Sequence, residues 1–294
     1  VTGLATGATV TIEETAAVAH TIDTAAGASV TVNMGATKAG SNVTVTDAAS
    51  VTLGGRAATG DMVATVLDDV DTTALSINTT AANDIDTGAI TSTDQLASIA
   101  ATTAADGGTI TTGAVADASS LASLTLTGVG GDITMTTIGN GGGADVAAQL
   151  ATINATATDG SDIIVGDLSA DTTTDSVTDL AMTVTASASG TTSGADVSSV
   201  SLGNIDNQYG SITANLSGAE NVDLDVLTAV DVTVTRSGAG DTDIEDILAS
   251  GDVTVTLTGS GTIDIGETGT PVTVTGDFTV AGGTHTGAID IDTD

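Results

Sequence analysis

One stretch organises the chain: it runs Asn140-Gly141-Gly142-Gly143-Ala144-Asp145 and resumes at Asp159-Gly160-Ser161-Asp162-Ile163-Ile164-Val165-Gly166-Asp167-Leu168-Ser169-Ala170-Asp171. It concentrates glycine and aspartate in the middle of a chain rich in Thr, Ala, Val and Gly. Asp162 and Asp171 are nine residues apart, and each closes a turn of small residues. Glycine and aspartate are favoured in tight turns, so the stretch predicts closely spaced turns.

These turns match in part the nonapeptide repeat G-G-x-G-x-D-x-U-x, in which U is a large apolar residue. Around Asp162, Gly160 lies two residues before the aspartate and Ile164 two residues after it. Around Asp171 the match is weaker, because Ser169 replaces a glycine of the pattern. The stretch therefore resembles a degenerate RTX repeat, and this resemblance implies a calcium-binding parallel β-helix.

Calcium is accordingly the expected cofactor. The ion takes six to eight oxygen ligands at flexible distances, and turns of small residues let backbone carbonyls face it. Aspartates on the same turns would add negative charge. The predicted ligands are Asp145, Asp159, Asp162, Asp167 and Asp171. The alternative interpretation is that these Gly-Asp clusters are ordinary turns.

The composition predicts a thin hydrophobic core. Of the 294 residues 40% are hydrophobic, but Tyr209 and Phe278 are the only aromatic ones. A globular enzyme of this length normally needs aromatic bulk to fill a thick core. A core of Val, Ile, Leu, Ala and Thr suits a narrow coil or a flat sandwich instead.

The charge of the chain excludes several partners. Three basic residues stand against 38 acidic ones, which gives a net charge of -35. Nothing is present to neutralise phosphates, so nucleic acid is excluded as a direct partner, and an anionic membrane surface is equally unsuitable. So much like charge destabilises a compact state at low salt, and bound cations would relieve it.

Two further absences bear on class and location. The chain has no cysteine, so an extracellular form would depend on ions or lateral packing in place of disulfides. No stretch approaches 18 consecutive apolar residues, so we expect no transmembrane segment.

Alternating apolar and polar residues predict many short strands. Examples lie at 9–12, 29–32, 42–45, 50–53, 253–257, 263–265, 272–275, 278–280 and 289–291. Three other segments, at 58–70, 94–105 and 144–153, are predicted to form short helices. Asp94, for instance, is a plausible helix N-cap ahead of Leu96 and Ile99.

An internal similarity favours a repeat architecture. Residues 116–121 (Ala-Asp-Ala-Ser-Ser-Leu) recur as residues 195–200 (Ala-Asp-Val-Ser-Ser-Val), and each copy leads into a strand, a glycine turn and another strand. We therefore predict an all-β fold, a parallel β-solenoid with irregular coils, and tandem acidic β-sandwich modules as the alternative. The expected organisation is an N-terminal β-rich part (1–139), a degenerate Gly/Asp calcium-turn region (140–175) and a C-terminal β-rich part (176–294).

Residues 218–224 (Gly-Ala-Glu-Asn-Val-Asp-Leu) carry a second resemblance. They are similar to segments of bacterial surface-layer (S-layer) proteins that are secreted with RTX repeats. The resemblance implies an extracellular, cell-surface β-solenoid that self-assembles with calcium, as a subunit of a surface layer or a filament. Its expected partners are further copies of itself, with cell-surface polysaccharide as another candidate. The alternative is a calcium-stabilised adhesin segment of the RTX type, which would stay monomeric.

No enzymatic activity is expected. His20 and His285 lie far apart, and no Gly-x-Ser-x-Gly elbow stands between a strand and a helix with a histidine partner. Pairs of carboxylates carry no information in a chain with this much aspartate, and a sugar-cleaving site would usually offer an aromatic platform. Arg236 is expected to form a surface ion pair of little energetic value.

Thr-x-Thr tripeptides support a rival hypothesis. They occur at 9–11, 44–46, 125–127, 183–185, 254–256 and 273–275, and each places two threonines on one face of a strand. Such ladders resemble the ice-binding face of β-solenoid antifreeze proteins. Their uneven spacing favours a plainer interpretation, in which threonine is a good strand former on a solvated face.

Overall fold

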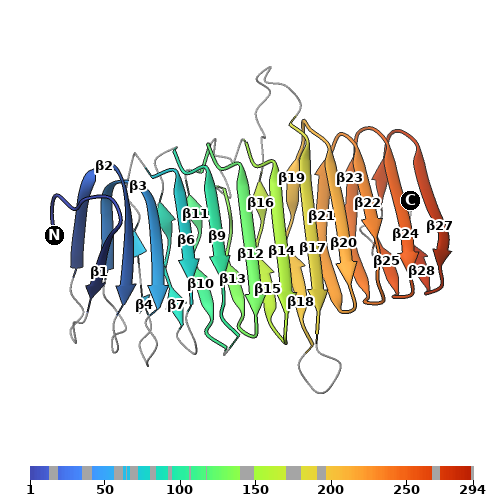
Figure 1. Ribbon diagram of the computed structural model, residues 1–294. Helices are drawn as coiled ribbons and strands as arrows, with labels where there is room; N and C mark the ends of the chain where they lie inside the picture. The colour runs from blue at the N-terminus through green and yellow to red at the C-terminus, as the bar shows by residue number, and fades with distance from the viewer. Residues whose placement is uncertain are drawn as a thin grey trace.

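The computed structural model shows a long parallel β-solenoid, with the two chain ends at opposite ends of the molecule (Figure 1). It describes residues 1–12, 19–34, 42–55, 62–63, 65–66, 72–79, 84–91, 95–105, 107–116, 118–139, 149–169, 180–190, 197–266 and 272–292. Every strand pairing in these ranges is parallel. The predicted solenoid is therefore confirmed, and antiparallel sandwich modules are excluded for this part of the chain.

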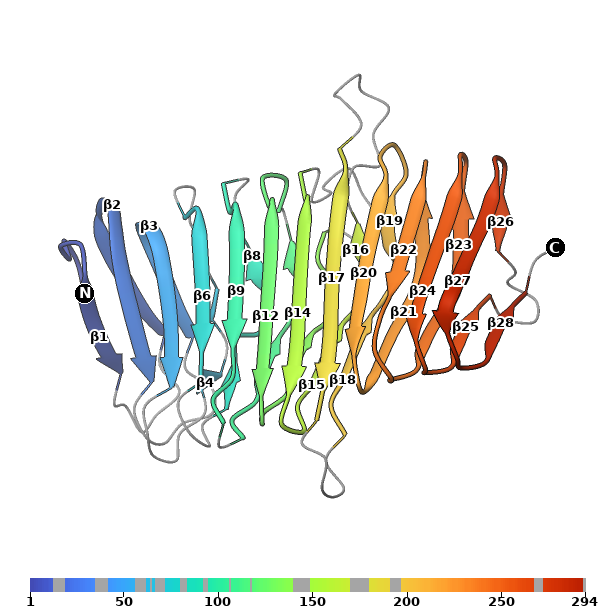
Figure 2. The ribbon, with the colours of Figure 1, turned by 45° about the vertical axis from the view of Figure 1, so that its right-hand side comes forward.

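Two sheets face each other across the core. The first sheet follows the order β1 (Ala8–Ile12), β2 (Ala19–Met34), β3 (Asn42–Gly55), β6 (Ala74–Asn78), β9 (Ser98–Thr102), β12 (Ser123–Val129), β14 (Thr152–Thr158), β17 (Met182–Ser189), β20 (Ile212–Gly218), β22 (Val232–Arg236), β24 (Val253–Gly259) and β27 (Phe278–His285), with β5 (Thr65–Val66) beside β3. Figure 2 shows these strands side by side along the length of the molecule.

The second sheet lies behind the first. Its order is β4 (Met62–Val63), β7 (Ile85–Asp86), β10 (Ile110–Thr112), β13 (Ile133–Met135), β15 (Asp162–Val165), β18 (Ser199–Leu202), β21 (Asn221–Ala229), β23 (Thr242–Ala249), β25 (Ile263–Ile265) and β28 (Ile289–Ile291), joined by β16 (Leu168–Ser169), β19 (Ile205–Asn207) and β26 (Thr273–Val274). A separate pair comprises β8 (Ile90–Thr91) and β11 (Val115–Ala116).

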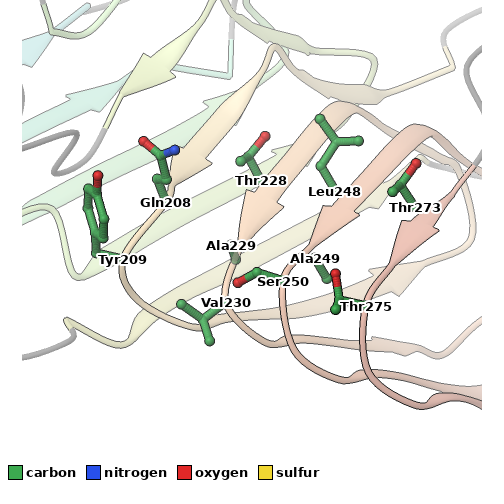
Figure 3. Close-up of a pocket in the computed structure, with 10 residues that line it drawn as sticks. All are labelled: Gln208, Tyr209, Thr228, Ala229, Val230, Leu248, Ala249, Ser250, Thr273 and Thr275. Atoms are coloured by element: carbon green, nitrogen blue, oxygen red, sulfur yellow. The ribbon is translucent and has the colours of Figure 1, made fainter.

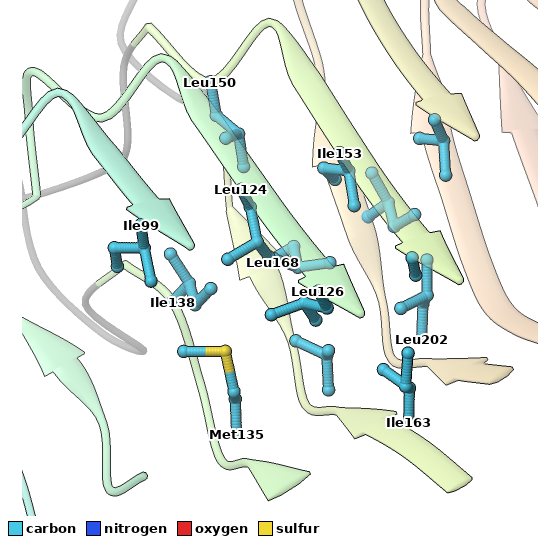
Figure 4. Packing of buried hydrophobic residues seen from close by; sticks show 14 of the residues in the cluster. Ile99, Leu124, Leu126, Met135, Ile138, Leu150, Ile153, Ile163, Leu168 and Leu202 are labelled. Atoms are coloured by element: carbon cyan, nitrogen blue, oxygen red, sulfur yellow. The ribbon is translucent and has the colours of Figure 1, made fainter. Parts of the chain in front are cut away.

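The core is thin and aliphatic, as the composition predicts. Along each strand the apolar residues alternate inward and the polar residues outward, so Leu124 and Leu126 of β12 are buried while Thr125 is exposed. These leucines point across to Met135 and Ile163 of the second sheet (Figure 4). One cluster of buried side chains continues from Ile12 to Val272. Each fully buried aliphatic side chain contributes roughly 1.5–3 kcal/mol.

The coils differ in length, but the ladders stay in register. Hydrogen bonds between stacked coils join residues 21 apart at Asp231 and Asp252, 30 apart at Asp132 and Asp162, and 37 apart at Asp162 and Ser199. Register shifts within strands occur between β2 and β3 and between β24 and β27, whereas the pairings β12–β14, β14–β17 and β22–β24 keep a constant register. Uneven spacing along the sequence therefore coexists with even stacking in space.

The helix predictions are wrong where the structure describes them. Within 94–105, β9 occupies Ser98–Thr102 and Ile99 faces the core, while within 58–70 the short strands β4 and β5 form. In 144–153, β14 begins at Thr152, and residues 144–148 lie outside the described ranges. Ladder hydrogen bonds from the neighbouring coils override weak helical preference here. The described residues hold no helix capable of spanning a bilayer.

The internal similarity proves not to mark the coil repeat. The copy at 116–121 leads into β12 of the first sheet, whereas the copy at 195–200 runs into β18 of the second sheet. The two copies thus occupy different positions in their coils. The predicted boundaries at 139 and 175 stay a prediction, although pairings β12–β14 and β14–β17 carry the first sheet across both.

Candidate functional site

Three register rows of small uncharged residues run along the outer surface of the first sheet, and we call these rows the hydroxyl face; Asp23 of β2 lies on the same sheet outside them. Its middle row follows the strand register through Thr9, Thr31, Thr52, Ser76, Ala100, Thr125, Asn154, Thr185, Asn215, Thr235, Thr256 and Ala281. A second row runs through Ser29, Ser50, Ala74, Ser98, Ser123, Thr152, Thr183, Thr213, Thr233, Thr254 and Thr279. A third runs through Thr11, Asn33, Gly54, Asn78, Thr102, Thr127, Thr156, Ser187 and Ser217.

The geometry of this face follows from the sheet. Stacked residues lie about 4.8 Å apart, and residues two apart along a strand lie about 6.6 Å apart. Neighbouring hydroxyls are close enough to bond, as when Ser50 Oγ donates to Ser29 Oγ at 2.8 Å. The result is a nearly rectangular lattice of hydroxyl, amide and methyl groups.

The absence of charge is the unusual property of the hydroxyl face. No residue of its three rows is Asp, Glu, Lys or Arg, although the chain carries a net charge of -35. A surface designed for solubility would carry about 25–35% charged residues. Threonine between inward-facing Val, Ile and Ala satisfies the strand, but strand formation alone does not require that every charge be kept away.

The outer surface of the second sheet is different. Its register row passes through Asp86, Thr111, Thr134, Ile164, Ser201, Asp223, Asp243, Asp264 and Asp290. The last four form an unbroken line of carboxylates on β21, β23, β25 and β28, which we call the acidic row. Like charges one strand apart repel each other, so this line is electrostatically unfavourable unless cations approach it.

The pKa of Asp223 reflects this crowding. Partial burial raises it above its ordinary value, and the charges of Asp243, Asp225 and Asp241 raise it further. Burial also raises the pKa of Asp246, a core-facing residue on β23 that is 7% exposed and whose Oδ1 has no hydrogen-bond partner. The ionised form of both carboxyl groups is therefore disfavoured in this part of the second sheet.

The predicted calcium ligands fall in separate places. Asp159 lies in the turn before β15 with a positive φ of 56°, and Asp167 lies after the other end of that strand. Asp162 accepts a hydrogen bond from Ser199 Oγ at 2.7 Å, while Asp167 Oδ1 accepts one from the Asn204 amide at 3.2 Å. The other two, Asp145 and Asp171, lie outside the described residues.

Within the described ranges, no three His, Asp or Glu side chains lie close enough together to form a ready-made metal site. Calcium at the Gly/Asp stretch accordingly stays a prediction. Asp159 is a turn residue, and Asp162 and Asp167 accept hydrogen bonds from the next coil.

Hydrogen bonds to the next coil are a general role of aspartate in this chain. The Asp132 carboxylate accepts from the Asp162 amide at 2.9 Å, Asp231 from the Asp252 amide at 2.8 Å, and Asp252 from the Asp277 amide at 2.9 Å. Asp84 and Asp241 do the same for Thr109 and Thr262, respectively. Each of these five acceptors immediately precedes a strand, and this pattern was readable in the sequence.

Arg236 is not on the surface, so the predicted surface ion pair is wrong. Its side chain is 2% exposed and stands in the core ladder between Leu216 and Leu257. The guanidinium donates to the backbone carbonyls of Gly218, Ser237 and Gly240. Burial lowers the pKa of Arg236, and the nearby charge of Asp241 partly opposes this. The residue closes a solenoid corner.

Comparisons with protein-family models, with curated proteins and with solved structures gave no match to this chain.

Proposed function

We propose that this chain is a structural, self-assembling extracellular protein, a subunit of a surface layer or filament whose copies pack through the hydroxyl face. One observation carries the proposal: in a chain with a net charge of -35, three rows of outward residues along the first sheet contain no charged residue. The proposal includes calcium as the ion that stabilises the acidic row.

Electrostatics favours this face as the contact. Exposed charges are screened beyond about 8 Å at physiological ionic strength. Stacked sheets lie about 10 Å apart, so the acidic row sits more than one screening length behind the hydroxyl face. Two copies that meet through their hydroxyl faces therefore keep their acidic rows apart, with exposed aspartates such as Asp231 and Asp252 only at the border of the contact, whereas contact through the second sheet would oppose carboxylates directly.

The chemistry of the face also suits sheet-on-sheet contact. Threonine, serine and asparagine each offer a donor and an acceptor, so two facing lattices can exchange hydrogen bonds, each worth about 0.5–1.5 kcal/mol. The threonine methyl groups add apolar area. Many equivalent weak contacts in register give an interface that extends with the length of the solenoid.

A matched pair of double variants tests the proposal. Thr185→Asp with Thr235→Asp adds two charges to the hydroxyl face, and Thr111→Asp with Thr134→Asp adds two charges to the second sheet. In calcium, electron microscopy and sedimentation should show assemblies of the wild type and of the Thr111→Asp, Thr134→Asp variant. The Thr185→Asp, Thr235→Asp variant should stay monomeric. Equal assembly of both variants would contradict the proposal, and a wild type that stays monomeric in calcium would favour the adhesin alternative.

A second function, ice binding, gains support from the strand register. Four Thr-x-Thr tripeptides, at 9–11, 125–127, 183–185 and 254–256, lie together on the hydroxyl face despite their uneven spacing in the sequence. In the sequence, the uneven spacing argued against an ordered ladder. In the structure, coils of different length still align these threonines in the strand register. Thermal hysteresis that is lost in the hydroxyl-face variant and kept in its control would support this function; no hysteresis at high concentration would end it.

A further inference from the structure

A groove crosses the second sheet near its carboxyl-terminal half (Figure 3). It has a volume of about 480 Å³ and spans β19, β21, β23 and β26. Such a volume lies within the usual range for small-molecule sites, about 300–1,000 Å³. Unlike the flat hydroxyl face, the groove therefore has the size to hold one bound molecule.

The walls of the groove come from aligned positions on successive coils. Thr228, Leu248 and Thr273 stand in register on one side, and the turn residues Ser250 and Thr275 lie along the other (Figure 3). The small side chains of Ala229 and Ala249 leave the space between them. Because the groove runs from coil to coil, it suits an extended ligand that lies along the solenoid axis.

The chemistry of the lining is specific. Tyr209, the only tyrosine of the chain, closes one end beside Gln208. The lining thus combines an aromatic ring, a primary amide, four hydroxyls and a few apolar side chains, and none of its ten residues is charged. An aromatic ring supplies a flat apolar face, while hydroxyl and amide groups both donate and accept hydrogen bonds.

We propose that the Tyr209 groove binds a neutral saccharide chain. A sugar ring presents an apolar face of C–H groups, which the tyrosine ring can stack against, and a rim of hydroxyls, which Gln208 and the groove threonines can bond. The uncharged lining offers no partner for an ionised ligand, and the acidic protein around it repels anions. A linear glycan also matches the open, elongated shape. This inference is independent of assembly, because it concerns the monomer.

The unique tyrosine provides the measurement. The chain has no tryptophan, so intrinsic fluorescence excited at the tyrosine band reports the groove alone. Monomeric protein is titrated with maltohexaose, cellohexaose and the hexamer of N-acetylglucosamine, with hexagalacturonate as the acidic control. At least one neutral probe should give a saturable change, and the acidic control should give none. No saturable change with any neutral probe up to millimolar concentration would overturn the proposal.

Variants locate the binding. Leu248 is 37% exposed, so Leu248→Arg should fold normally, as circular dichroism will show, yet fill the groove and weaken binding at least tenfold. Tyr209→Ala, followed by calorimetry, should weaken binding by a similar factor. Thr134→Val on β13, three strands from the groove along the second sheet, is the control and should leave affinity unchanged. Affinity that survives both Leu248→Arg and Tyr209→Ala would overturn the assignment to this groove.

Discussion

The two outer faces of this solenoid are built from the same coils, yet after residue 200 they differ sharply in charge. Thr235 on β22 and Asp243 on β23 belong to consecutive strands of one turn, and each points to solvent from a strand whose other side is aliphatic. The core constrains only the inward positions. The outward positions are free, so the separation of hydroxyls to one sheet and carboxylates to the other is a property that folding does not require.

A finer contrast runs along the second sheet. Its outer row is neutral from Thr111 to Ser201 and then carries four aspartates in succession. Electrostatic cost is thus concentrated where the Tyr209 groove also lies, in the coils after residue 200. On the second sheet, the carboxylates are concentrated in one part of the outer row, whereas the uncharged rows of the first sheet run along its length.

The largest expected effect compares inward with outward positions of one strand. Val234→Asp places a carboxylate in the core, where the valine is 1% exposed, and should lower the free energy of unfolding by about 3–5 kcal/mol because the charge is unpaired. Thr235→Asp, one residue along, should change it by less than about 0.5 kcal/mol. Urea unfolding measures both. If both changes lowered the free energy of unfolding by similar amounts, Val234 could not be the inward residue and Thr235 the outward one.

Calcium should act on the acidic row rather than uniformly over the chain. Calcium at ten times its dissociation constant should raise the free energy of unfolding by about 1.4 kcal/mol per site. Asp243→Asn with Asp264→Asn should remove part of this gain, whereas Asp159→Asn with Asp162→Asn tests the Gly/Asp stretch in the same assay. The melting temperatures of the wild type and of both double variants, each with calcium and with chelator, show whether the acidic row or the pair Asp159 and Asp162 binds the ion. A melting temperature indifferent to chelator would rule out both sites.

Aspartates that bond the next coil should behave differently from those in the acidic row. Asp252→Ala leaves the Asp277 amide without its acceptor and should cost about 1 kcal/mol. Asp264→Ala removes a charge between Asp243 and Asp290, so it should be neutral or stabilising. Chemical denaturation of the two single variants gives the comparison. A larger loss for Asp264→Ala would mean that the row is a structural element.

The smallest effect concerns pH. The folded-state pKa of Asp223 is raised above its ordinary value of 3.8, so its contribution to stability is fully present below that value and is lost as pH rises through the folded pKa. Asp223→Asn should therefore stabilise the protein at pH 7 and flatten its stability profile on the acid side. The measurement is the difference between wild-type and variant unfolding curves from pH 4 to pH 7. An unchanged difference across this range would contradict the raised pKa.

Part of the candidate site could be read from the sequence and part could not. The Thr-x-Thr tripeptides predicted hydroxyl ladders, but their uneven spacing concealed that most of them share one sheet. Asp162 and Asp167 were predicted as ligands because Gly-Asp turns suit calcium, whereas the structure shows them accepting hydrogen bonds from Ser199 and Asn204. The sequence shows that these carboxylates lie next to strands, but it does not show which donor of the next coil lies above them.

The Tyr209 groove is another feature that the sequence alone does not reveal. Tyr209 was recognised as one of two aromatic residues, and its scarcity argued against a sugar site. Only folding brings it into one groove with Thr228 and Thr273, which belong to later coils. A single ring is enough when the surrounding hydroxyls come from stacked strands.

The sequence by itself determined the thin aliphatic core, the alternation that separates inward from outward residues, and the acidity of the whole. These are local properties, because the period of two in a strand and the charge of a side chain need no knowledge of distant residues. The tertiary structure decided the register, and with it the hydroxyl face, the acidic row and the groove. Register is set by hydrogen bonds between residues 21 to 37 apart across loops of unequal length, so no fixed period in the sequence encodes it.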